Sequence, residues 1–485
     1  MSNGPIDFKT RAHQAMLDAG FQPDFSPEVM REALAKQTAP NRPAAKVQDL
    51  RALLWSSIDN DSSRDLDQVE YVEKLANGTL RLLVGIADVD ASVPKVSVTD
   101  QHAALEGTSV YTGVVTFPML PAELSTDRTS LLGEQDREAV IIELRIQDSG
   151  DVTCHDVFRG TLRNRAKLAY SSTGAWLEGN GPIPPAIESV PGMEAQLRLQ
   201  LETSQKLRAI RKSRGLLAFS SVEAEPVLAN GQVTDLAVTK RTVADDIIES
   251  FMVGANVAMA EHLKECGALS LRRVVKTPKR WDRIQAIAAP FGVKLPDTPD
   301  PRALAAFLDQ RRAADPVHFP DLSLAVVKML GAGEYIVEHP GEEHEGHFGL
   351  AVEDYTHSTA PNRRYADLVT QRLLKATADG APGPYAEKEL GDIAARCTER
   401  EDAARKVERL MRKVVAAGML SRQIGQVFDG IITGASPKGT YVRLLKFPAE
   451  GMVVHGAQGL DVGDKVQVRL ASVDIAKGFI NFERK

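Results

Sequence analysis

Cysteine, aromatic residues, long apolar runs and a strong net charge are all scarce in this chain of 485 residues. The three cysteines lie far apart without a Cys-x-x-Cys pair, which argues against a disulfide framework and a zinc knuckle. No run approaches the length of a membrane span, and the first residues lack the basic and apolar segments of a signal peptide. We therefore expect a cytoplasmic protein with no membrane contact.

The charge is distributed unevenly along the chain. The net charge is −6, so no global basic field indicates a nucleic-acid partner. The last 65 residues, however, carry nine Lys and Arg against six Asp and Glu, a net of +3 that leaves −9 for the rest. This asymmetry favours the C-terminal part as the segment that binds a polyanion.

The chain is long enough for about three domains, and 43% of its residues are hydrophobic. Strand-like patterns begin near Leu53 and include residues 79–89 and 139–146. Helical periodicity dominates the ranges 186–212, 244–266, 280–291, 301–313, 321–331, 364–377 and 386–421. We predict an α+β fold with an N-terminal domain at 1–47, a large domain at 48–422 and a C-terminal domain at 423–485.

The two ends of the chain differ in character. Residues 1 to 38 predict two short helices around a turn, which form either a helix-turn-helix that binds nucleic acid or a plain helical cap. Residues 425–482 contain five short glycine-separated strands, the pattern of a small OB-fold barrel. Such barrels commonly bind single-stranded nucleic acid, and a purely structural barrel is the alternative.

A dense group of acids follows the first predicted strand. Asp59, Asp65 and Asp67 lie within nine residues, with Asp61 and Glu70 beside them. Carboxylates this close repel one another unless a cation neutralises them. Oxygen ligands favour Mg²⁺, or Mn²⁺, over zinc, and Mg²⁺ is a common catalyst of attack at phosphorus. A solvated acidic loop and a structural calcium site are the alternatives.

Histidines crowd a second segment. His339, His344, His347 and His357 raise the question of a zinc site. Pro340 and Gly341 interrupt any helix that would align the first two, and no cysteine is near. We therefore do not predict zinc.

Three ordered blocks resemble the ribonuclease II family, whose catalytic unit is the RNB domain. The first is Asp59 to Asp67 with the strand at 83–89, the second is 117–125, and the third runs from His347 to Asp367. The tail is similar to the OB-fold RNA-binding domain named after ribosomal protein S-one. The resemblance covers roughly residues 50 to 485.

The resemblance implies a Mg²⁺-dependent exoribonuclease that degrades single-stranded RNA processively from its 3′ end to 5′-mononucleotides. It assigns the metal to Asp59, Asp65 and Asp67, with Asp67 as the most critical residue. Arg363 would stabilise the charge that develops on the phosphoryl oxygens, or else form a structural ion pair. Arg364 would hold a neighbouring phosphate, or else lie solvated on the surface.

The resemblance also implies an RNA path. Tyr111 and Phe219 match the aromatic pair that clamps the RNA, and Tyr170 matches the residue that stacks near its 3′ end. Glu249 and Glu408 match acids near the terminal sugar, where they would accept hydrogen bonds from its hydroxyls. Without the family match, the aromatic residues are core candidates and the acids are helix-surface ion-pair candidates.

Two departures from the family pattern affect these expectations. The acidic signature normally ends in two adjacent aspartates, but here Gln68 follows Asp67. An amide oxygen can bind a metal but brings no charge, so a non-catalytic RNA-binding relative is the alternative function. About 47 residues also precede the catalytic block, too few for the usual cold-shock barrels, so we expect a short form of the family. We also expect the protein to be a monomer.

Overall fold

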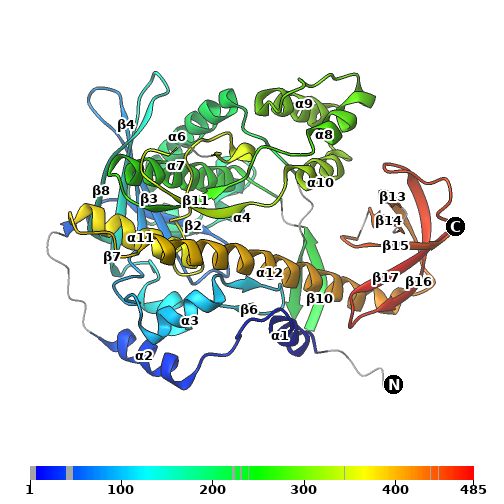
Figure 1. Ribbon diagram of the computed structural model, residues 1–485, viewed down its shortest axis with the longest axis horizontal. Helices are drawn as coiled ribbons and strands as arrows, with labels where there is room; N and C mark the ends of the chain where they lie inside the picture. Colours follow the sequence, from blue (N-terminus) through cyan, green and yellow to red (C-terminus); the bar gives the residue numbers. More distant parts are fainter. Residues whose placement is uncertain are drawn as a thin grey trace.

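The computed structural model describes residues 7–39, 47–220, 224–229, 232–238, 240–342, 345–436, 439–445 and 447–485. Helices and a central sheet form a large body, and a long helix leads from this body to a small barrel (Figure 1). None of the helices in these ranges is long and apolar enough to cross a membrane. The arrangement confirms the predicted α+β fold with a five-stranded C-terminal barrel.

The central sheet has the strand order β1-β8-β2-β3-β4-β7. The strands are β1 (Gln48–Asp49), β2 (Trp55–Asp59), β3 (Gln68–Lys74), β4 (Leu80–Ala87), β7 (Asp136–Ile146) and β8 (Val152–Ala169). The long strand β8 pairs antiparallel with β7 and parallel with β2. The last strand of the order, β7, is therefore also hydrogen-bonded to β8 near its beginning. β4 is apolar and nearly all buried, as expected for a strand covered on both faces.

Helices cover the sheet and complete the main core. These include α4 (Tyr170–Leu177), α6 (Met193–Arg214), α7 (Val243–Glu265) and α11 (Tyr365–Ala378). α6 contacts β3, while α7 contacts β7 and β8. α7 begins at a capping box in which the side chains and backbones of Thr242 and Asp245 satisfy each other. Apolar residues from the sheet and from α6, α7 and α11 belong to one buried cluster.

The remaining elements form smaller units around this body. They are α3 (Val98–Glu106), β5 (Val110–Tyr111), β6 (Thr116–Phe117), α5 (Pro185–Glu188), β9 (Ala224–Ala229), β10 (Gln232–Val238), β11 (Ser270–Val274), α8 (Trp281–Ala288), α9 (Pro301–Ala314), α10 (Phe319–Leu330) and β12 (Glu334–Glu338). Helices α8, α9 and α10 share an apolar cluster of their own. They lie on the side of the body toward the barrel (Figure 1).

The barrel is joined to the body by the helix α12 (Glu387–Leu420), which at 1.5 Å per residue is about 51 Å long. Its strands are β13 (Val427–Ser436), β14 (Gly439–Leu444), β15 (Glu450–His455), β16 (Lys465–Asp474) and β17 (Phe479–Arg484). Ala416, Ala417 and Leu420, near the end of α12, belong to the barrel core. Arg443 of β14 also forms a two-pronged ion pair with Asp321 of α10, and Arg11 of α1 (Phe8–Asp18) donates to the carbonyl of Ala476 at 3.0 Å, so the body holds the barrel through α1 and α10 as well as α12.

The two N-terminal helices are α1 (Phe8–Asp18) and α2 (Pro27–Thr38). Ser26 caps the second helix, because its side chain accepts from Val29 N. α1 packs its apolar face on α12 in a cluster that contains Met16 and Met411. α2 contacts α3, and its Glu32 accepts from the N-terminal amides of α3. These helices therefore share their core with the body. Binding of nucleic acid by them stays a prediction.

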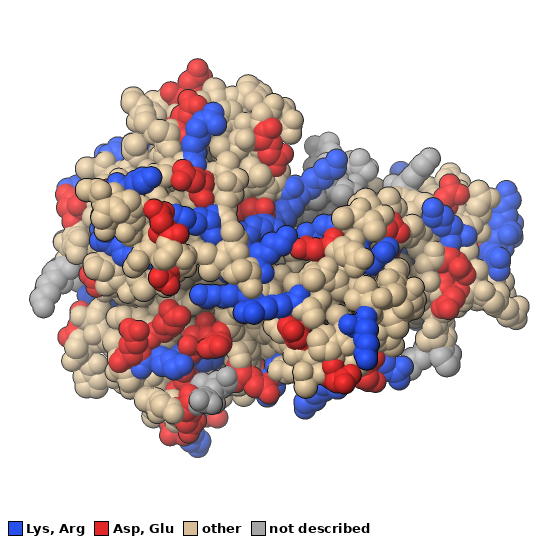
Figure 2. Space-filling view, turned by 90° about the horizontal axis from the view of Figure 1, so that it is seen from above, with Lys and Arg blue, Asp and Glu red and all other residues tan. Residues whose placement is uncertain are grey.

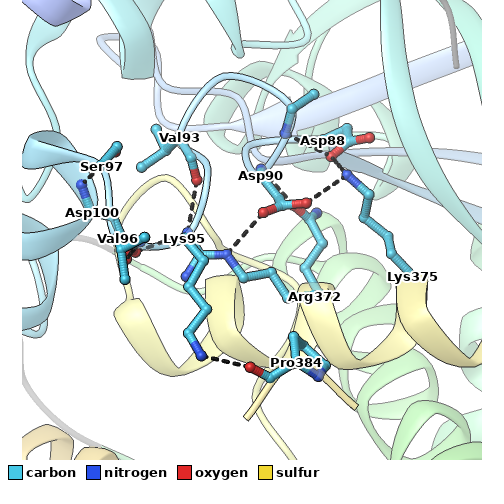
Figure 3. Close-up of polar contacts among 12 residues, drawn as sticks. Asp88, Asp90, Val93, Lys95, Val96, Ser97, Asp100, Arg372, Lys375 and Pro384 are labelled. Atoms are coloured by element: carbon cyan, nitrogen blue, oxygen red, sulfur yellow. Dashed lines mark hydrogen bonds and ion pairs between the residues drawn. The ribbon is translucent and has the colours of Figure 1, made fainter. Parts of the chain in front are cut away.

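A buried charge network fixes α11 to the loop that follows β4 (Figure 3). Arg372 of α11 donates to Asp90, to the carbonyl of Val93 and to the hydroxyl of Tyr385. Its guanidinium also pairs with Asp100 at 2.8 Å. One turn further along α11, Lys375 bridges Asp88 and Asp90. The network sets the position of the helix that begins directly after Arg363 and Arg364.

Replacing Arg372 by leucine should lower the free energy of unfolding by about 3–5 kcal/mol, because it leaves buried carboxylates without their counter-ion. Arg372 is 4% exposed, so solvent cannot take its place. Urea unfolding followed by circular dichroism measures the loss. Arg396→Leu is the control. The side chain of that arginine is 42% exposed and approaches Glu399 no closer than 4.0 Å, and such surface pairs contribute about 0–1 kcal/mol. Equal losses in the two variants would contradict the role of the network.

Candidate active site

The acidic loop connects the neighbouring ends of β2 and β3. Asp59 is the last residue of β2, and Asp67 directly precedes β3. The two strands are antiparallel, with Ser56 opposite Glu70, so the loop ends meet. Gln68 Nε2 donates to Asp59 Oδ1 at 3.4 Å across this junction.

Ser130 holds the loop in place. Its hydroxyl donates to the carbonyl of Arg64 at 2.6 Å and accepts from the amide of Leu66 at 3.0 Å. Ser130 is fully buried, and Leu131 N donates to the carbonyl of Leu66 as well. The backbone around Asp65 and Asp67 is therefore fixed by the segment that precedes β7.

The two most distant sequence blocks meet at Asp67. This carboxylate is 2% exposed, and its Oδ1 accepts from the main-chain amide of Asn362 at 2.9 Å. Its Oδ2 lies 3.4 Å from Nε of Arg363, whose side chain is 42% exposed. The structure thus brings together the predicted catalytic pair, and it leaves the guanidinium open on the solvent side.

Asp367 shapes the loop that carries Arg363. It is fully buried, and it accepts from the amide of Ala360 at 2.8 Å. It also accepts two bonds of 2.8 Å from the guanidinium of Arg364. The fork of Arg364 is therefore bound to the protein itself rather than solvated. Its predicted contact with an RNA phosphate stays a prediction, with Asp367 as a competing partner.

Two of the predicted aromatic residues lie at the acidic centre. Desolvation raises the pKa of the Tyr111 phenol, and the charges of Arg363, Asp65 and Asp67 are the next influences on it. Burial likewise raises the pKa of Tyr170, on which the charges of Asp59, Glu70, Asp245 and Arg363 also act. Both rings are thus within electrostatic range of the acids. Phe219, by contrast, packs partly buried against the cluster of α8, α9 and α10.

The two predicted sugar-binding acids have protein partners. Glu408 Oε1 accepts from the main-chain amide of Tyr111 at 3.1 Å, so it positions the backbone of that tyrosine. Glu249 pairs with Arg241 and lies 3.6 Å from Arg211. The ion-pair alternative describes what Glu249 does in this structure, and hydrogen bonding of either acid to RNA stays a prediction.

The predicted metal ligands differ in burial and in partners. Burial raises the pKa of both Asp59 and Asp67 to about 7; repulsion from Asp65 adds to the effect and the charge of Arg363 opposes it. Asp59 Oδ2 is buried and has no hydrogen-bond donor. Buried carboxylates with raised pKa values have too little positive charge around them to stabilise their ionised form. A bound cation would supply that charge, so the arrangement is typical of a cation site.

The donor set fits Mg²⁺ or Mn²⁺ by its chemistry, since it consists of carboxylate and amide oxygens. Across the described ranges, no three His, Cys, Asp or Glu side chains are arranged closely enough to hold a metal ion. Mg²⁺ commonly takes only one or two protein carboxylates and completes its shell with water and substrate phosphate. The arrangement therefore fits a cation shared with a bound phosphate rather than a closed protein cage.

The histidines have separate partners. His339 pairs with Glu342 and Glu387, and His357 Nδ1 lies 2.7 Å from the hydroxyl of Tyr335. His347 caps a short helical turn by accepting from Leu350 N. His344 lies outside the described residues.

Sequence reasoning missed three residues of the site. The main-chain amide of Asn362 donates to Asp67 and fixes its carboxylate, and the side chain of Asn362 accepts from the hydroxyl of Thr129. Asp367 holds the arginine loop, and Glu70 is fully buried on β3. Asn362 and Asp367 stand inside the third block, which was a usable signal. Glu70 was noted beside the acid cluster but had no motif to assign it a role.

A carboxylate cluster facing an arginine loop, with a small barrel at the end of a long helix, is the architecture of proteins built on the RNB domain. The chain belongs to the RNB family: the RNB domain model matches residues 47–380. The model for the C-terminal S1 domain of RNase II-type exonucleases matches residues 426–485. The predicted family is thereby confirmed.

Relatives with similar sequences carry ribonuclease names. Ribonuclease R of Thermotoga maritima is 32% identical over 450 residues, which cover 89% of this chain and 61% of the relative. Ribonuclease R 1 of Lactococcus lactis is 29% identical over 494 residues, covering 95% and 59%. The chain thus spans about three fifths of the length of these curated relatives.

Solved structures share the fold. Mycoplasma genitalium RNase R, in complex with ribose methylated single-stranded RNA, has a TM-score of 0.88 at 24% identity, covering 99% of this chain and 78% of that one. Yeast Ssd1, described as a pseudonuclease, has a TM-score of 0.75 at 18% identity, covering 96% and 58%. The same fold therefore occurs both in a protein named as a ribonuclease and in one described as a pseudonuclease.

The raised pKa values predict a pH dependence of stability. Asp59 and Asp67 titrate near pH 7 when folded, against an ordinary value of 3.8. Between these values the folded state binds more protons than the unfolded chain, so the free energy of unfolding should fall as pH rises from about 4 to about 7. Melting temperatures measured in chelator across this range test the sign. Asp59→Asn should flatten part of the decline relative to the wild type, and parallel curves would contradict the assignment.

Proposed function

We propose that the protein is a Mg²⁺-dependent, hydrolytic 3′-to-5′ exoribonuclease that degrades single-stranded RNA processively to 5′-mononucleotides. The observation that carries this proposal is the meeting of Asp67, Asn362 and Arg363, where a buried carboxylate lies beside a half-exposed guanidinium. Family membership supports the reaction class, and the barrel supports RNA as the substrate.

The chain's own residues have distinct tasks in this proposal. Asp59, Asp65 and Asp67 would hold the cation, which when bound supplies Lewis-acid polarisation of the phosphate and a more acidic water. Arg363 would donate to the phosphoryl oxygens as charge develops on them. Tyr111 and Tyr170 would stack on bases without selecting among them, as suits an enzyme that advances along any sequence.

The surface is consistent with an anionic substrate. Figure 2 shows Lys and Arg side chains across the middle of the face seen from above, with Asp and Glu side chains beside them. Positive charge at this place would attract the phosphate backbone, and binding should weaken as salt rises. We propose that the protein acts in the cytoplasm and as a monomer. Sedimentation analysis tests the monomeric state.

One assay decides the reaction and its direction. A 5′-labelled single-stranded RNA incubated with Mg²⁺ should shorten from its 3′ end, with 5′-mononucleotides as products. The same RNA with chelator, and a DNA of the same sequence, should remain intact. Chelator-resistant cleavage, internal cuts or nucleoside diphosphate products under added phosphate would contradict the proposal.

A non-catalytic RNA-binding protein is the second candidate. Gln68 stands where a carboxylate is expected, and the similar fold of the pseudonuclease Ssd1 shows that this architecture exists without turnover. In that case the RNA would bind in the same assay but stay at full length with Mg²⁺ and with Mn²⁺.

A further inference from the structure

Glu70 is a buried carboxylate in the middle of β3. Its residue is 0% exposed, and neither of its side-chain oxygens has a hydrogen-bond partner. Gln200 of α6 lies over the same place, where its amide donates to the hydroxyl of Ser56 and to the main-chain carbonyl of Glu70. The Oε1 atom of Gln200 is likewise without a donor, so three side-chain acceptor oxygens of Glu70 and Gln200 lie buried without a hydrogen-bond partner.

Such a carboxylate is costly for the fold. Removing a charge from water without a counter-ion or hydrogen bonds disfavours folding. In the described part of the chain, no Lys, Arg or His forms an ion pair with Glu70, and the one charge that bears on it is the like charge of Asp59. The site therefore has the composition of a cation site.

Asp59 supplies a further free oxygen, and its charge acts on Glu70. Its Oδ1 receives the amide of Gln68, while its Oδ2 is buried and has no donor. Tyr170 lies close enough that the charges of both Asp59 and Glu70 act on its phenol. Three buried carboxylate oxygens, from Asp59 and Glu70, thus remain without any partner.

The position of Glu70 relative to Gln68 is the decisive feature. In a strand, residues two apart project from the same face at a spacing of about 7 Å, so Glu70 follows Gln68 on one face of β3. The carboxylate that is missing at position 68 is therefore present two residues later on the same face. The longer glutamate side chain also reaches further than an aspartate would.

We propose that Glu70 replaces the carboxylate that Gln68 does not provide, so that Asp59 and Glu70 together hold a divalent cation of the hydrolytic centre. This inference rests on the proposed function, because it assigns a ligand to the same metal-dependent site. It also distinguishes this chain from a relative that has lost turnover, since the negative charge is moved rather than lost.

The test measures cation binding directly, without RNA and without turnover. Mn²⁺ binding to the full chain is followed by electron paramagnetic resonance in the wild type, in Glu70→Gln and in Glu70→Leu. Loss of a residue that supports a metal site weakens binding by roughly 10- to 100-fold, and we expect that loss in both variants. Glu73→Gln is the matched control on the same strand, because Glu73 pairs with Arg81 at 2.8 Å outside the site. It should bind Mn²⁺ as the wild type does.

A rescue variant separates a ligand from a structural acid. Gln68→Asp combined with Glu70→Gln returns the carboxylate to position 68 and should recover Mn²⁺ affinity to within a few-fold of the wild type. Circular dichroism confirms that each variant is folded, and the folded double variant decides if the single variants are not. Unchanged Mn²⁺ affinity in folded Glu70→Gln or Glu70→Leu, or no recovery in the double variant, overturns the inference.

The two proposals fail in distinguishable ways. If the wild type binds no Mn²⁺ and cleaves RNA in chelator, the metal-dependent function itself is wrong. If the wild type binds Mn²⁺ and degrades RNA while Glu70→Gln binds Mn²⁺ equally well, only the role of Glu70 is wrong. A rise in melting temperature for Glu70→Leu with unchanged Mn²⁺ binding would identify Glu70 as an ordinary buried acid.

Discussion

Replacement of Asp67 by asparagine should abolish RNA hydrolysis while RNA binding persists. Asparagine has nearly the same volume, and its amide oxygen can still accept from the main chain of Asn362 at the distance of 2.9 Å seen for Asp67. What disappears is the negative charge, which faces Arg363 at 3.4 Å and belongs to the proposed cation site. Groups whose effect is confined to the transition state are commonly worth about 10²–10³ in rate, and we expect a loss of at least that size.

The binding side of this prediction has a definite sign. Removing one negative charge near the RNA backbone should leave the affinity for single-stranded RNA equal or slightly higher. Single-turnover hydrolysis and fluorescence-anisotropy titration, both at fixed salt, measure the two effects separately. Asp61→Asn is the matched control, because Asp61 lies exposed in the same loop and bonds to Ser171. Turnover within a few-fold of the wild type in Asp67→Asn would place the reaction elsewhere.

The parts of the site that could be predicted from sequence are those encoded locally. Asp59, Asp65 and Asp67 stand in a short loop whose strands are evident from their apolar patterns. The C-terminal barrel was likewise predictable, since its five short strands are separated by segments that contain glycine. The meeting of Asp67 with Arg363 could be expected only from the family resemblance, because 295 residues separate Asp67 from the amide of Asn362 that it accepts from.

Other features depend on packing that no local pattern reports. Glu70 stands in the sequence beside the acidic cluster without an assigned role, and it is buried because α6 covers that face of β3. Arg364 looks like a free phosphate contact, yet its fork is bound by Asp367 three residues later. Phe219 matched an RNA clamp, and the helices α8, α9 and α10 provide an apolar surface for it; its contact with RNA stays a prediction. For Glu70 and Phe219 the packing partner comes from an element whose position the sequence does not specify, whereas Asp367 stands only three residues from Arg364.

Replacement of Arg363 by lysine should lower the rate of hydrolysis by about 10²–10³, although the positive charge is kept. A guanidinium presents a rigid planar fork to phosphoryl oxygens, whereas an ammonium is a compact point charge. The backbone of this residue should not move, because its carbonyl accepts from the amide of Ser109 at 2.9 Å and from the hydroxyl of Thr108 at 3.2 Å. The effect should therefore reflect donor geometry and not a misfolded loop.

The kinetic pattern distinguishes this role from simple attraction of RNA. If Arg363 acts on developing charge, kcat falls while KM and the melting temperature stay near their wild-type values. If it only attracts the backbone, lysine substitutes well and the loss in Arg363→Ala appears in KM and in the salt dependence of binding. Arg64→Lys, in the exposed part of the acidic loop, is the control and should leave both constants unchanged. A lysine variant with wild-type kcat would reduce Arg363 to the counter-ion of Asp67, so that the fork itself would have no part in hydrolysis.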